Sequence, residues 1–323
     1  MGHRWISCAA LALAACGQDA PTKAAPPPPP ATATVRAAVH AAAVTPPAPV
    51  APPIPEQIHV VIISVDGLRP DIITDEIMPR HVALMKQGVT ARLASTIDLS
   101  DTLPSHAAML SGRGVAAHGL SWNSFKENRG YIKIPTVFSA ARAQGLSTAM
   151  IVGKQKLRHI AGPGNVDYFE RPSYLCHGVA RRAGEYLREH MPDLLFVHFS
   201  DPDEYGHSHG WMSKEYVTAA RNSDACLGTV LDAIDASPVA ASTLVIVTAD
   251  HGGTAHHHSN GRQAVNSHIP WIARGPGIQP GTTIDEPVVT FDTAATALAA
   301  LGLASLPDMA GVSRIDFHHA VVR

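Results

Sequence analysis

Short apolar runs that alternate with helix-like stretches constrain the fold of this chain more than any other feature. The runs are bounded by turn residues, as in strands buried on both faces. They are His59–Gly67, Thr148–Val152, Leu194–Phe199, Leu244–Thr248 and Ile269–Ala273. The helix-like stretches are Asp75–Gln87, Pro135–Gln144, Ser173–Glu189, Ser213–Ile234 and Phe291–Ala300. This alternation predicts an α/β fold with a mainly parallel sheet.

Polar residues that follow the apolar runs mark the candidate site, because ligands of such sheets bind beyond the carboxyl ends of the strands. Asp66 ends the first run, Asp203 lies just after the third, and Asp250 and His251 follow the fourth. Asp66 by itself could also be a turn aspartate before glycine. Asp203 and His207 are one helical turn apart and can face one metal ion. The mixture of aspartate and histidine suits zinc or another borderline transition ion.

Thr102 is a candidate nucleophile. It lies just ahead of a predicted helix of small residues, near backbone N–H groups that favour an anion. A helix cap by Thr102 or Ser105 is the alternative interpretation. Two metal ions and an activated hydroxyl are together sufficient for an in-line displacement at phosphorus.

The motifs around these residues resemble those of the alkaline phosphatase superfamily, in particular its nucleotide pyrophosphatase/phosphodiesterase-like branch. The resemblance runs from about His59 to Gly311 and includes VDGLRPD, which contains Asp66. The segment Thr102-Leu103-Pro104-Ser105-His106 resembles the family's Thr-Phe-Pro-Asn-His. The resemblance implies a three-layer α/β/α sandwich within residues 56–323, the predicted catalytic domain, and a nucleophilic role for Thr102.

The resemblance also implies two zinc ions and assigns most of their ligands. The implied ligands are Asp66, Thr102, Asp250 and His251 for one ion, and Asp203, His207 and a third histidine for the other. The family's spacing favours His258 as the third histidine, with His256 and His268 as alternatives. Asn123 resembles the asparagine of a His-Gly-x-x-x-Asn segment that binds a phosphoryl oxygen.

The implied reaction is hydrolysis of phosphate diesters, pyrophosphates or related small-molecule phosphate esters through a phospho-threonine intermediate. Two departures leave the substrate open. Leu103 and His198 stand where nucleotide-cleaving members have aromatic residues. Lys154 and Lys156 resemble a Lys-x-Lys segment of phosphonoacetate hydrolases and a Lys-x-Arg segment of phosphomonoesterases, and would bind extra negative charge; an exposed basic turn is the alternative. A phosphomonoester or a phosphonate is therefore an alternative substrate.

Other classes of protein fit less well. Sulfatases of the superfamily need a Cys/Ser-x-Pro-x-Arg motif, which the segment from Thr102 to His106 lacks. A zinc-binding protein without turnover is a remote alternative, because it would not need Thr102 and Asn123. The formal net charge of −2 gives no reason to expect a nucleic-acid polymer as a partner.

The N-terminal segment predicts export. Arg4 precedes a short apolar run that is typical of a secretory signal, and Leu13-Ala14-Ala15-Cys16-Gly17 resembles the bacterial lipobox. We expect a lipoprotein signal peptide over residues 1–15, lipid on Cys16 and a Pro/Ala-rich tether over residues 16–55. In bacterial lipoproteins, glycine rather than aspartate after the lipidated cysteine favours an outer-membrane anchor facing the periplasm. Ordinary cleavage near the same small residues is the alternative.

Cys176 and Cys226 remain after removal of the signal and would lie in a compartment that permits disulfides. They can pair or stay buried as free thiols, and the spacing does not decide between these. The oligomeric state also stays open.

Overall fold

The computed structural model describes residue 26 and residues 52–317, and the latter belong to one compact unit. The predicted signal peptide 1–15, the lipidation residue Cys16 and most of the predicted tether 16–55 lie outside the described residues. None of the helices in the described part is both long and apolar enough to cross a membrane.

Within residues 52–317, the strands form one eight-stranded and one three-stranded sheet. Their bounds are β1 His59–Val65, β2 Val89–Ala91, β3 Ala94–Ser95, β4 Thr148–Val152, β5 Tyr168–Glu170, β6 Leu194–Phe199, β7 Thr243–Thr248, β8 His268–Ile269, β9 Trp271–Arg274, β10 Thr282–Ile284 and β11 Val288–Val289. The larger sheet has the order β10-β2-β9-β7-β1-β6-β4-β5, and the smaller sheet has the order β11-β3-β8. The predicted runs at β1, β4, β6 and β7 are strands because their residues are buried on both faces.

The centre of the large sheet is parallel, as predicted. β1 pairs in parallel with β6 and with β7, and β6 pairs in parallel with β4. The register sets His198 of β6 opposite both Ser64 of β1 and Val152 of β4, and it sets Thr248 of β7 opposite Ser64. The carboxyl ends of these four strands therefore finish level with one another at one edge of the sheet.

The predicted strand Ile269–Ala273 is wrong in its extent. It is divided between β8 in the small sheet and β9 in the large sheet, and β9 runs antiparallel to β7. Pro270 lies between the two pieces and has no N–H to donate to a ladder. Its carbonyl instead accepts a hydrogen bond from Thr248 Oγ1 at 2.8 Å.

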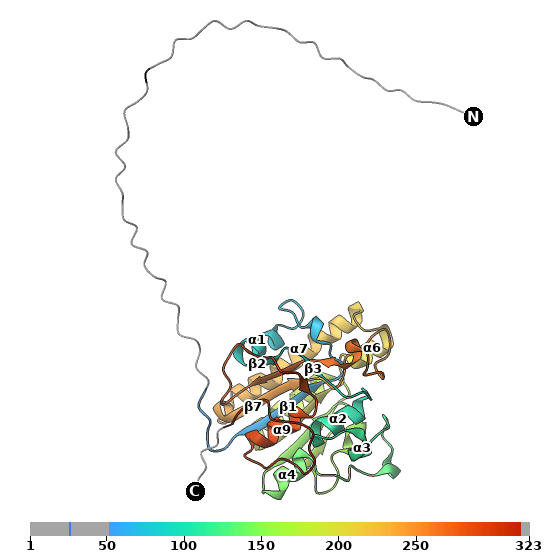
Figure 1. Ribbon diagram of the computed structural model, residues 1–323, viewed down its shortest axis with the longest axis vertical. Helices are drawn as coiled ribbons and strands as arrows, with labels where there is room; N and C mark the ends of the chain where they lie inside the picture. Colours follow the sequence, from blue (N-terminus) through green and yellow to red (C-terminus); the bar gives the residue numbers. More distant parts are fainter. Residues whose placement is uncertain (1–25, 27–51, 318–323) are drawn as a thin grey trace, which may run out of the picture. The chain divides into compact units, whose positions relative to one another are not determined.

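The helices lie on both faces of the large sheet. Their bounds are α1 Pro79–Gln87, α2 Thr102–Ser111, α3 Val115–His118, α4 Val137–Ala143, α5 Cys176–His190, α6 Asp203–His209, α7 Lys214–Asp235, α8 Ala264–Ser267 and α9 Asp292–Ala300. Short 3-10 helices cover Pro70–Ile72, Glu127–Arg129, Gln155–His159 and Ala240–Ser242. α1, α5 and α6 pack against α7, whereas α2 and α4 pack against α9. Figure 1 shows α1 and α7 on one side of β1 and β7, with α9, α2 and α4 on the other, so the three-layer α/β/α sandwich is confirmed.

Local sequence explains where these helices begin and which face they bury. α1 begins at Pro79, later than the predicted Asp75, because proline is favoured in the first helical turn. In α5 the buried residues Val179, Ala183 and Leu187 recur every four positions and face the sheet layer. The polar residues between them stay on the outside.

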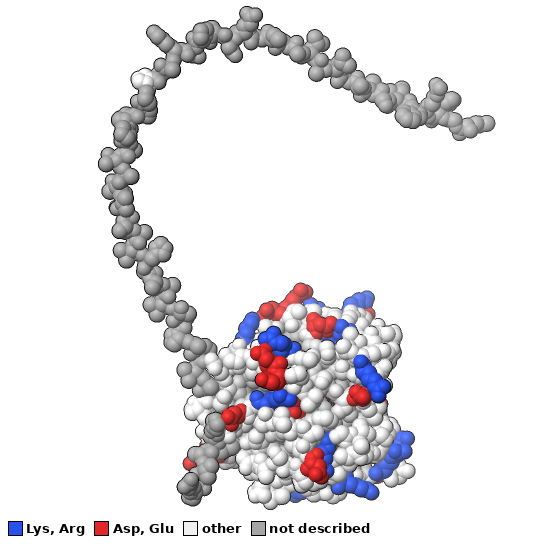
Figure 2. All heavy atoms as spheres, in the orientation of Figure 1, with Lys and Arg blue, Asp and Glu red and all other residues white. Residues whose placement is uncertain are grey.

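Charged side chains on the face drawn in Figure 2 lie in small groups that mix both signs. Exposed ion pairs of the domain include Arg92 with Asp285 and Lys86 with Asp75. Such pairs contribute little to stability, typically below about 1 kcal/mol each. This face carries no broad patch of one sign among the described residues.

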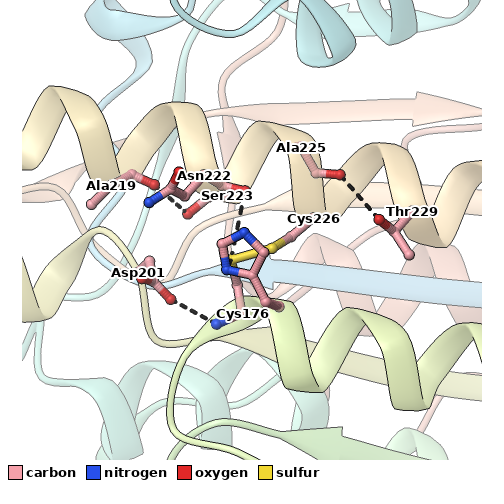
Figure 3. The surroundings of a disulfide bond; sticks show 9 residues. Cys176, Asp201, Ala219, Asn222, Ser223, Ala225, Cys226 and Thr229 are labelled. Atoms are coloured by element: carbon pink, nitrogen blue, oxygen red, sulfur yellow. Dashed lines mark hydrogen bonds between the residues drawn. A yellow bond between two sulfur atoms is a disulfide. The ribbon is translucent and has the colours of Figure 1, made fainter.

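A disulfide joins α5 to α7. Cys176, the first residue of α5, is bonded to Cys226 of α7, which decides the pairing that the sequence leaves open (Figure 3). The Cys176 N–H donates to Asp201 Oδ2 at 2.9 Å. The disulfide is therefore linked to the loop that follows β6, which leads directly into α6.

Candidate metal centre and active site

Charged side chains leave the large sheet in a row at its carboxyl edge. In sheet order, Asp250 follows β7, Asp66 follows β1, Asp203 follows β6 and Lys154 follows β4. Because these strands are parallel and end level, the four residues converge although they are far apart in sequence. Lys154 Nζ lies 2.7 Å from Asp66 Oδ2 and 2.5 Å from Asp203 Oδ2.

A buried set of candidate metal ligands consists of Asp66, Thr102, Asp250 and His251. Each of these residues is at most 1% exposed. His251 Nε2 lies 3.4 Å from Asp66 Oδ1 and 3.3 Å from Asp250 Oδ2. The other ring nitrogen, Nδ1, donates to Gly252 O at 2.8 Å, which keeps Nε2 directed at the carboxylates.

One oxygen of each carboxylate in the buried set is held by the protein. Asp250 Oδ1 accepts hydrogen bonds from the N–H groups of Gly67, at 3.2 Å, and His251, at 3.1 Å. Asp66 Oδ2 contacts Lys154, and it also accepts a hydrogen bond from His198 Nε2 at 2.9 Å. The opposite oxygens, Asp66 Oδ1 and Asp250 Oδ2, remain for a metal.

Gly67 allows the exits of β1 and β6 to approach each other. Its φ is 70°, in the left-handed region, and a Cβ at this position would lie 2.9 Å from Asp203 Cα. Asp203 N–H donates to Asp66 O at 3.1 Å across the same contact. A side chain at residue 67 would therefore push apart two carboxylates that the centre needs close together.

Thr102 is the first residue of α2, rather than a residue ahead of it. The alternative of a helix cap by Thr102 or Ser105 is wrong: Thr102 Oγ1 has no hydrogen-bond partner among the described residues, and Ser105 Oγ bonds Thr96 Oγ1 at 2.9 Å. Asn123 Oδ1 instead accepts from Leu103 N–H at 3.1 Å. The Thr102 hydroxyl is thus buried at a helix N-terminus without being used to cap it.

The rim set consists of Asp203, His207 and His258. Asp203 and His207 lie one turn apart on α6, and Asp203 Oδ1 is 3.4 Å from His207 Nε2. His258, from the loop after β7, brings its Nε2 to 3.0 Å from His207 Nε2 and 3.8 Å from Asp203 Oδ1. The His207 side chain is 43% exposed, whereas His258 is only 2% exposed.

Three histidines were candidates for the third ligand of the rim set. The structure brings His258, rather than His256 or His268, to Asp203. The Nδ1 of His258 donates to Ser100 O at 2.6 Å, which leaves Nε2 for the centre. His256 points its Nδ1 at His207 O, 2.9 Å away. His268 begins β8 and lines a different pocket, together with Trp271 and other apolar residues.

Five buried side-chain atoms at this centre have no hydrogen-bond partner among the described residues. They are Asp66 Oδ1, Thr102 Oγ1, Asp203 Oδ1, Asp250 Oδ2 and His251 Nε2. A buried polar atom left unpaired costs about 1–3 kcal/mol. The ligand atoms of Asp66, Asp203 and His251 lie within 4.8 Å of one another, as do those of the rim set. Carboxylate, hydroxyl and imidazole groups in this arrangement fit a metal centre.

Burial has the largest single influence on the charges of the centre. It raises the pKa of Asp250 to about 7, and the charge of Asp66 acts in the same direction. Burial also acts to raise the pKa of Asp66, but the charge of Lys154 and the contacts with His198 and His251 outweigh it and hold that pKa well below its usual value. Burial acts to lower the pKa of His251, but the carboxylates outweigh it and raise that pKa to about 9. Burial lowers the pKa of His258 to about 3, so its ring is neutral and able to bind a metal.

A cavity of about 380 Å³ opens onto the centre. Its lining includes Thr102, Asn123, Lys154, Lys156, Asp203 and His207. Lys156 lies in the 3-10 helix Gln155–His159, and its Nζ donates to Asn123 Oδ1 at 3.0 Å. The alternative of an exposed basic turn is wrong for Lys154, which is 6% exposed. Burial and the charge of Lys154 lower the pKa of Lys156.

The sequence did not predict every residue of the site. His198 appeared only as a departure from an aromatic position, yet it holds Asp66 from within β6. His106 lies beside it, 4.9 Å away between ring centroids, and donates through Nδ1 to Thr102 O at 2.7 Å. A histidine inside an apolar strand is the sequence feature that could have indicated His198. Arg171 and Tyr174, which also line the cavity, follow the unpredicted short strand β5.

Comparison with known proteins identifies the family. The family model described as "Type I phosphodiesterase / nucleotide pyrophosphatase" matches residues 60–274. The chain therefore belongs to this family, and the predicted branch of the alkaline phosphatase superfamily is confirmed. The particular relatives are ectonucleotide pyrophosphatase/phosphodiesterases. Family member 7 of Mus musculus is 23% identical over 245 residues, covering 66% of this chain and 54% of the relative. The chain spans about half the length of such relatives.

Other relatives are more distant or share a smaller segment. A steryl-sulfatase of Rattus norvegicus is 33% identical over 162 residues, which cover 41% of this chain and 27% of that protein. Among solved structures, murine ectonucleotide pyrophosphatase/phosphodiesterase 5 matches with a TM-score of 0.66 and 15% identity over 77% of this chain and 96% of that chain. A 2-O GAG sulfatase has the same TM-score of 0.66 and 17% identity, and the match covers 80% of this chain and 73% of that chain. These likenesses establish the fold.

Proposed function

We propose that this protein hydrolyses phosphoric ester bonds with Thr102 as nucleophile and two zinc ions as cofactors. One observation carries the proposal. The buried Thr102 hydroxyl has no hydrogen-bond partner among the described residues, and Thr102 lines one cavity together with Asp203, Asn123 and Lys156. Most buried side-chain hydroxyls have a hydrogen-bond partner within the protein.

The buried set and the rim set would each hold one zinc ion. When bound, the two ions would supply Lewis-acid stabilisation of the charge on the reacting phosphoryl group and a lowered pKa for the threonine hydroxyl. The ligand set in the proposal is Asp66, Thr102, Asp250 and His251 for one ion, and Asp203, His207 and His258 for the other.

The residues of the chain then have distinct tasks. Thr102 Oγ1, as its alkoxide, forms a bond to phosphorus while the bond to the leaving-group oxygen breaks, giving phospho-threonine and the departing alcohol or phosphate. The N-terminus of α2 favours negative charge on that oxygen. Water then attacks the phosphorus, and the bond between phosphorus and Thr102 Oγ1 breaks. This step releases the phosphoryl product and regenerates the free threonine side chain.

Asn123 and Lys156 would bind the non-bridging oxygens of the phosphoryl group. The hydrogen bonds of the Asn123 side chain to other described residues both use Oδ1, which accepts from Leu103 N–H and Lys156 Nζ. The amide N–H groups are therefore the part of Asn123 that can donate to substrate. A positioned donor of this kind stabilises charge as it develops in the transition state.

The family favours phosphate diesters and pyrophosphates as substrates, and a solved relative is an inactive ectonucleotide pyrophosphatase/phosphodiesterase 5 in complex with AMP. One observation favours a second candidate, a phosphomonoester or a phosphonate. Lys156 has no carboxylate partner among the described residues and lines the cavity with Thr102. An unneutralised ammonium in the same cavity as the nucleophile suits a substrate that carries more than one negative charge.

A substrate panel on the zinc-loaded protein tests the proposal. It contains p-nitrophenyl phosphate, bis-p-nitrophenyl phosphate, thymidine 5'-monophosphate p-nitrophenyl ester, phosphonoacetate and p-nitrophenyl sulfate. We expect turnover of at least one phosphorus compound and a loss of about 10³-fold or more in Thr102→Ala, with the zinc content nearly unchanged. Wild-type rates in Thr102→Ala would exclude threonine as the nucleophile, and preferred turnover of the sulfate would exclude the reaction class.

We also propose that the protein is exported and attached to the outer membrane through lipid on Cys16. The proposal rests on the sequence of the N-terminal segment. The disulfide between Cys176 and Cys226 supports an oxidising compartment. Metabolic labelling with a fatty acid, compared between the wild type and Cys16→Ser, tests it, and equal labelling of both proteins would contradict it.

A further inference from the structure

The row of strand-exit residues has a fifth member. β5 pairs in parallel with β4 at the edge of the large sheet, and Arg171 follows β5 as Lys154 follows β4. The order at the carboxyl edge is therefore Asp250, Asp66, Asp203, Lys154 and Arg171. Arg171 lines the same cavity as Thr102 and Lys156.

The protein fixes the Arg171 side chain but leaves most of its donors unused. Arg171 Nε donates to Gly153 O at 2.9 Å, directly before Lys154. Its guanidinium carbon lies 5.9 Å from the centroid of the Tyr174 ring. Among the described residues, no carboxylate pairs with Arg171, and its terminal nitrogens donate no hydrogen bond to another residue. A guanidinium held through Nε presents its other N–H groups as a fork that matches an oxyanion.

The acidic residues of the cavity are already engaged. Asp203 contacts Lys154 at 2.5 Å, and Glu204 Oε2 accepts a hydrogen bond from Tyr174 at 2.5 Å. Lys156 and Arg171, which also line the cavity, are not paired with any carboxylate among residues 52–317. The cavity therefore offers two unneutralised cations, one beside Asn123 and one at the exit of β5.

We propose that Arg171 binds a second anionic group of the substrate, a carboxylate or a phosphate, separate from the phosphoryl group that Thr102 attacks. The proposal rests on the proposed function, because it assumes that the phosphoryl group lies at Thr102. Arg171 Nε is held at Gly153 O, at the exit of β4, and β4 lies on the side of β6 opposite β1, so the guanidinium is held on the side of the β6 exit away from Asp66. We therefore place the second anionic group on a part of the substrate that extends from the phosphoryl group toward the exits of β4 and β5. The substrate class is an organic phosphate or phosphonate that carries another oxyanion on its leaving group or its retained group.

Matched substrates test this role of Arg171. Phenyl phosphate and methyl phenyl phosphate cover monoester and diester chemistry. Each is compared with analogues that carry a 4-carboxylate, a 4-phosphate or, as the neutral match, a 4-carboxamide. The readout is the ratio of kcat/KM for the anionic analogue to kcat/KM for the carboxamide. Comparison of this ratio between variants cancels the intrinsic reactivity of each leaving group.

The variants are Arg171→Gln, Arg171→Lys and a matched control, Arg158→Gln. Arg158 also lacks a carboxylate partner and lies over an aromatic ring, 5.1 Å from the centroid of Phe169, but it does not line the cavity. We expect the ratio to fall about 10- to 100-fold in Arg171→Gln, mainly through KM, as for loss of a hydrogen bond to a charged group. Arg171→Lys should retain part of the ratio, and Arg158→Gln should retain all of it.

The outcomes separate this proposal from the proposed function. If no phosphorus compound is turned over, the proposed function fails and the proposal falls with it. If the carboxamides are turned over but the ratio is unchanged in Arg171→Gln, Arg171 binds no second anion and only this proposal is overturned. A fall confined to the 4-carboxylate or to the 4-phosphate series identifies which oxyanion the site accepts. Thermal melting of each variant identifies a folding defect, and in that case Arg171→Lys carries the test.

Discussion

The two ligand sets of the candidate metal centre differ in how much of them solvent reaches. In the buried set, Asp66, Asp250 and His251 are 0% exposed and Thr102 is 1% exposed. In the rim set, the His207 side chain is 43% exposed on the short helix α6. Both sets are built from the same kinds of side chain, so the difference comes from the elements that carry them.

Strands and a buried helix carry the buried set, whereas loops and a short helix carry most of the rim set. Asp66 and Asp250 follow adjacent strands in the centre of the sheet. His207 and His258 are held mainly by hydrogen bonds to carbonyl groups: His207 Nδ1 donates to His256 O at 3.0 Å, and His258 Nδ1 donates to Ser100 O. If each set holds one ion, as proposed, we expect the buried set to bind its ion more tightly and to exchange it more slowly than the rim set.

The largest effect is expected from Asp250→Asn in the buried set. Loss of a charged ligand with no replacement should remove about one metal ion per chain and lower kcat/KM by about 10³-fold, because one metal is worth several kcal/mol in the transition state. Mass spectrometry measures the metal content, and kinetics on the preferred substrate measure kcat/KM. Asp193→Asn, at the amino-terminal end of β6, is the matched control and should retain activity. Full metal content and activity in Asp250→Asn would remove this residue from the ligand set.

A smaller and reversible effect is expected from His207→Ala in the rim set. At trace zinc, activity should fall about 100-fold, and added zinc should restore part of it because Asp203 and His258 remain as ligands. His251→Ala, in the buried set, should not recover in the same titration. His209→Ala, an exposed histidine on the same helix, is the control. Equal recovery of His207→Ala and His251→Ala would contradict the distinction between the two sets.

In His256→Ala, the metal affinity of the rim set should fall about tenfold. The effect should act through the position of His207, because His256 is not itself a proposed ligand. The rings and carbonyls of His207 and His256 are joined by two reciprocal hydrogen bonds. Removal of the His256 ring frees α6 from the loop that carries His258, and supporting residues of this kind typically change metal affinity 10- to 100-fold. A competitive chelator titration of the rim ion measures the change.

Two variants make the His256 test specific. In His256→Asn, the side-chain amide can still donate to His207 O, so metal affinity should largely return. His257→Ala removes an exposed neighbouring ring and should leave metal affinity as it was. If His257→Ala and His256→Ala weaken binding equally, the loop as a whole is responsible rather than the hydrogen bond of His256.

Removal of the disulfide should lower the stability of the protein. Its effect on turnover should be the smallest of those predicted here. It closes a loop with a sequence separation of 50 residues, and its removal in Cys176→Ala/Cys226→Ala should cost about 2–4 kcal/mol in the free energy of unfolding. Urea unfolding of the metal-free protein measures this cost. Because Cys176 N–H contacts Asp201 near the exit of β6, any loss of metal should occur at the rim set first. An unchanged unfolding midpoint would show that the disulfide does not constrain the unfolded chain.

Much of the site could be predicted because its residues lie at strand ends. Asp66, Asp203 and Asp250 each follow a run of apolar residues, and a parallel sheet brings the carboxyl ends of its strands to one edge. The position of Thr102 beside them was predicted from motif resemblance. The local sequence pattern was sufficient to predict these residues because the spacing within each motif is short and the strands are buried on both faces.

Other parts could not be predicted because they depend on contacts between distant segments. His198 contacts Asp66 only through the pairing of β6 with β1. Arg171 joins the cavity only because β5, a strand of three half-buried residues, pairs with β4. The division at Pro270 between two sheets likewise depends on which strands lie on either side.

The sequence by itself determined the α/β class, the strand ends that carry the acidic residues, and the motifs that define the family. These are properties of short stretches, where periodicity and turn residues act locally. Only the tertiary structure decided that His258 rather than His256 or His268 meets Asp203, that Cys176 pairs with Cys226, and that His207 reaches solvent while the other candidate ligands are buried. The physical reason is that metal ligation, disulfide geometry and burial depend on distances of a few ångströms between residues that only the folded chain brings together.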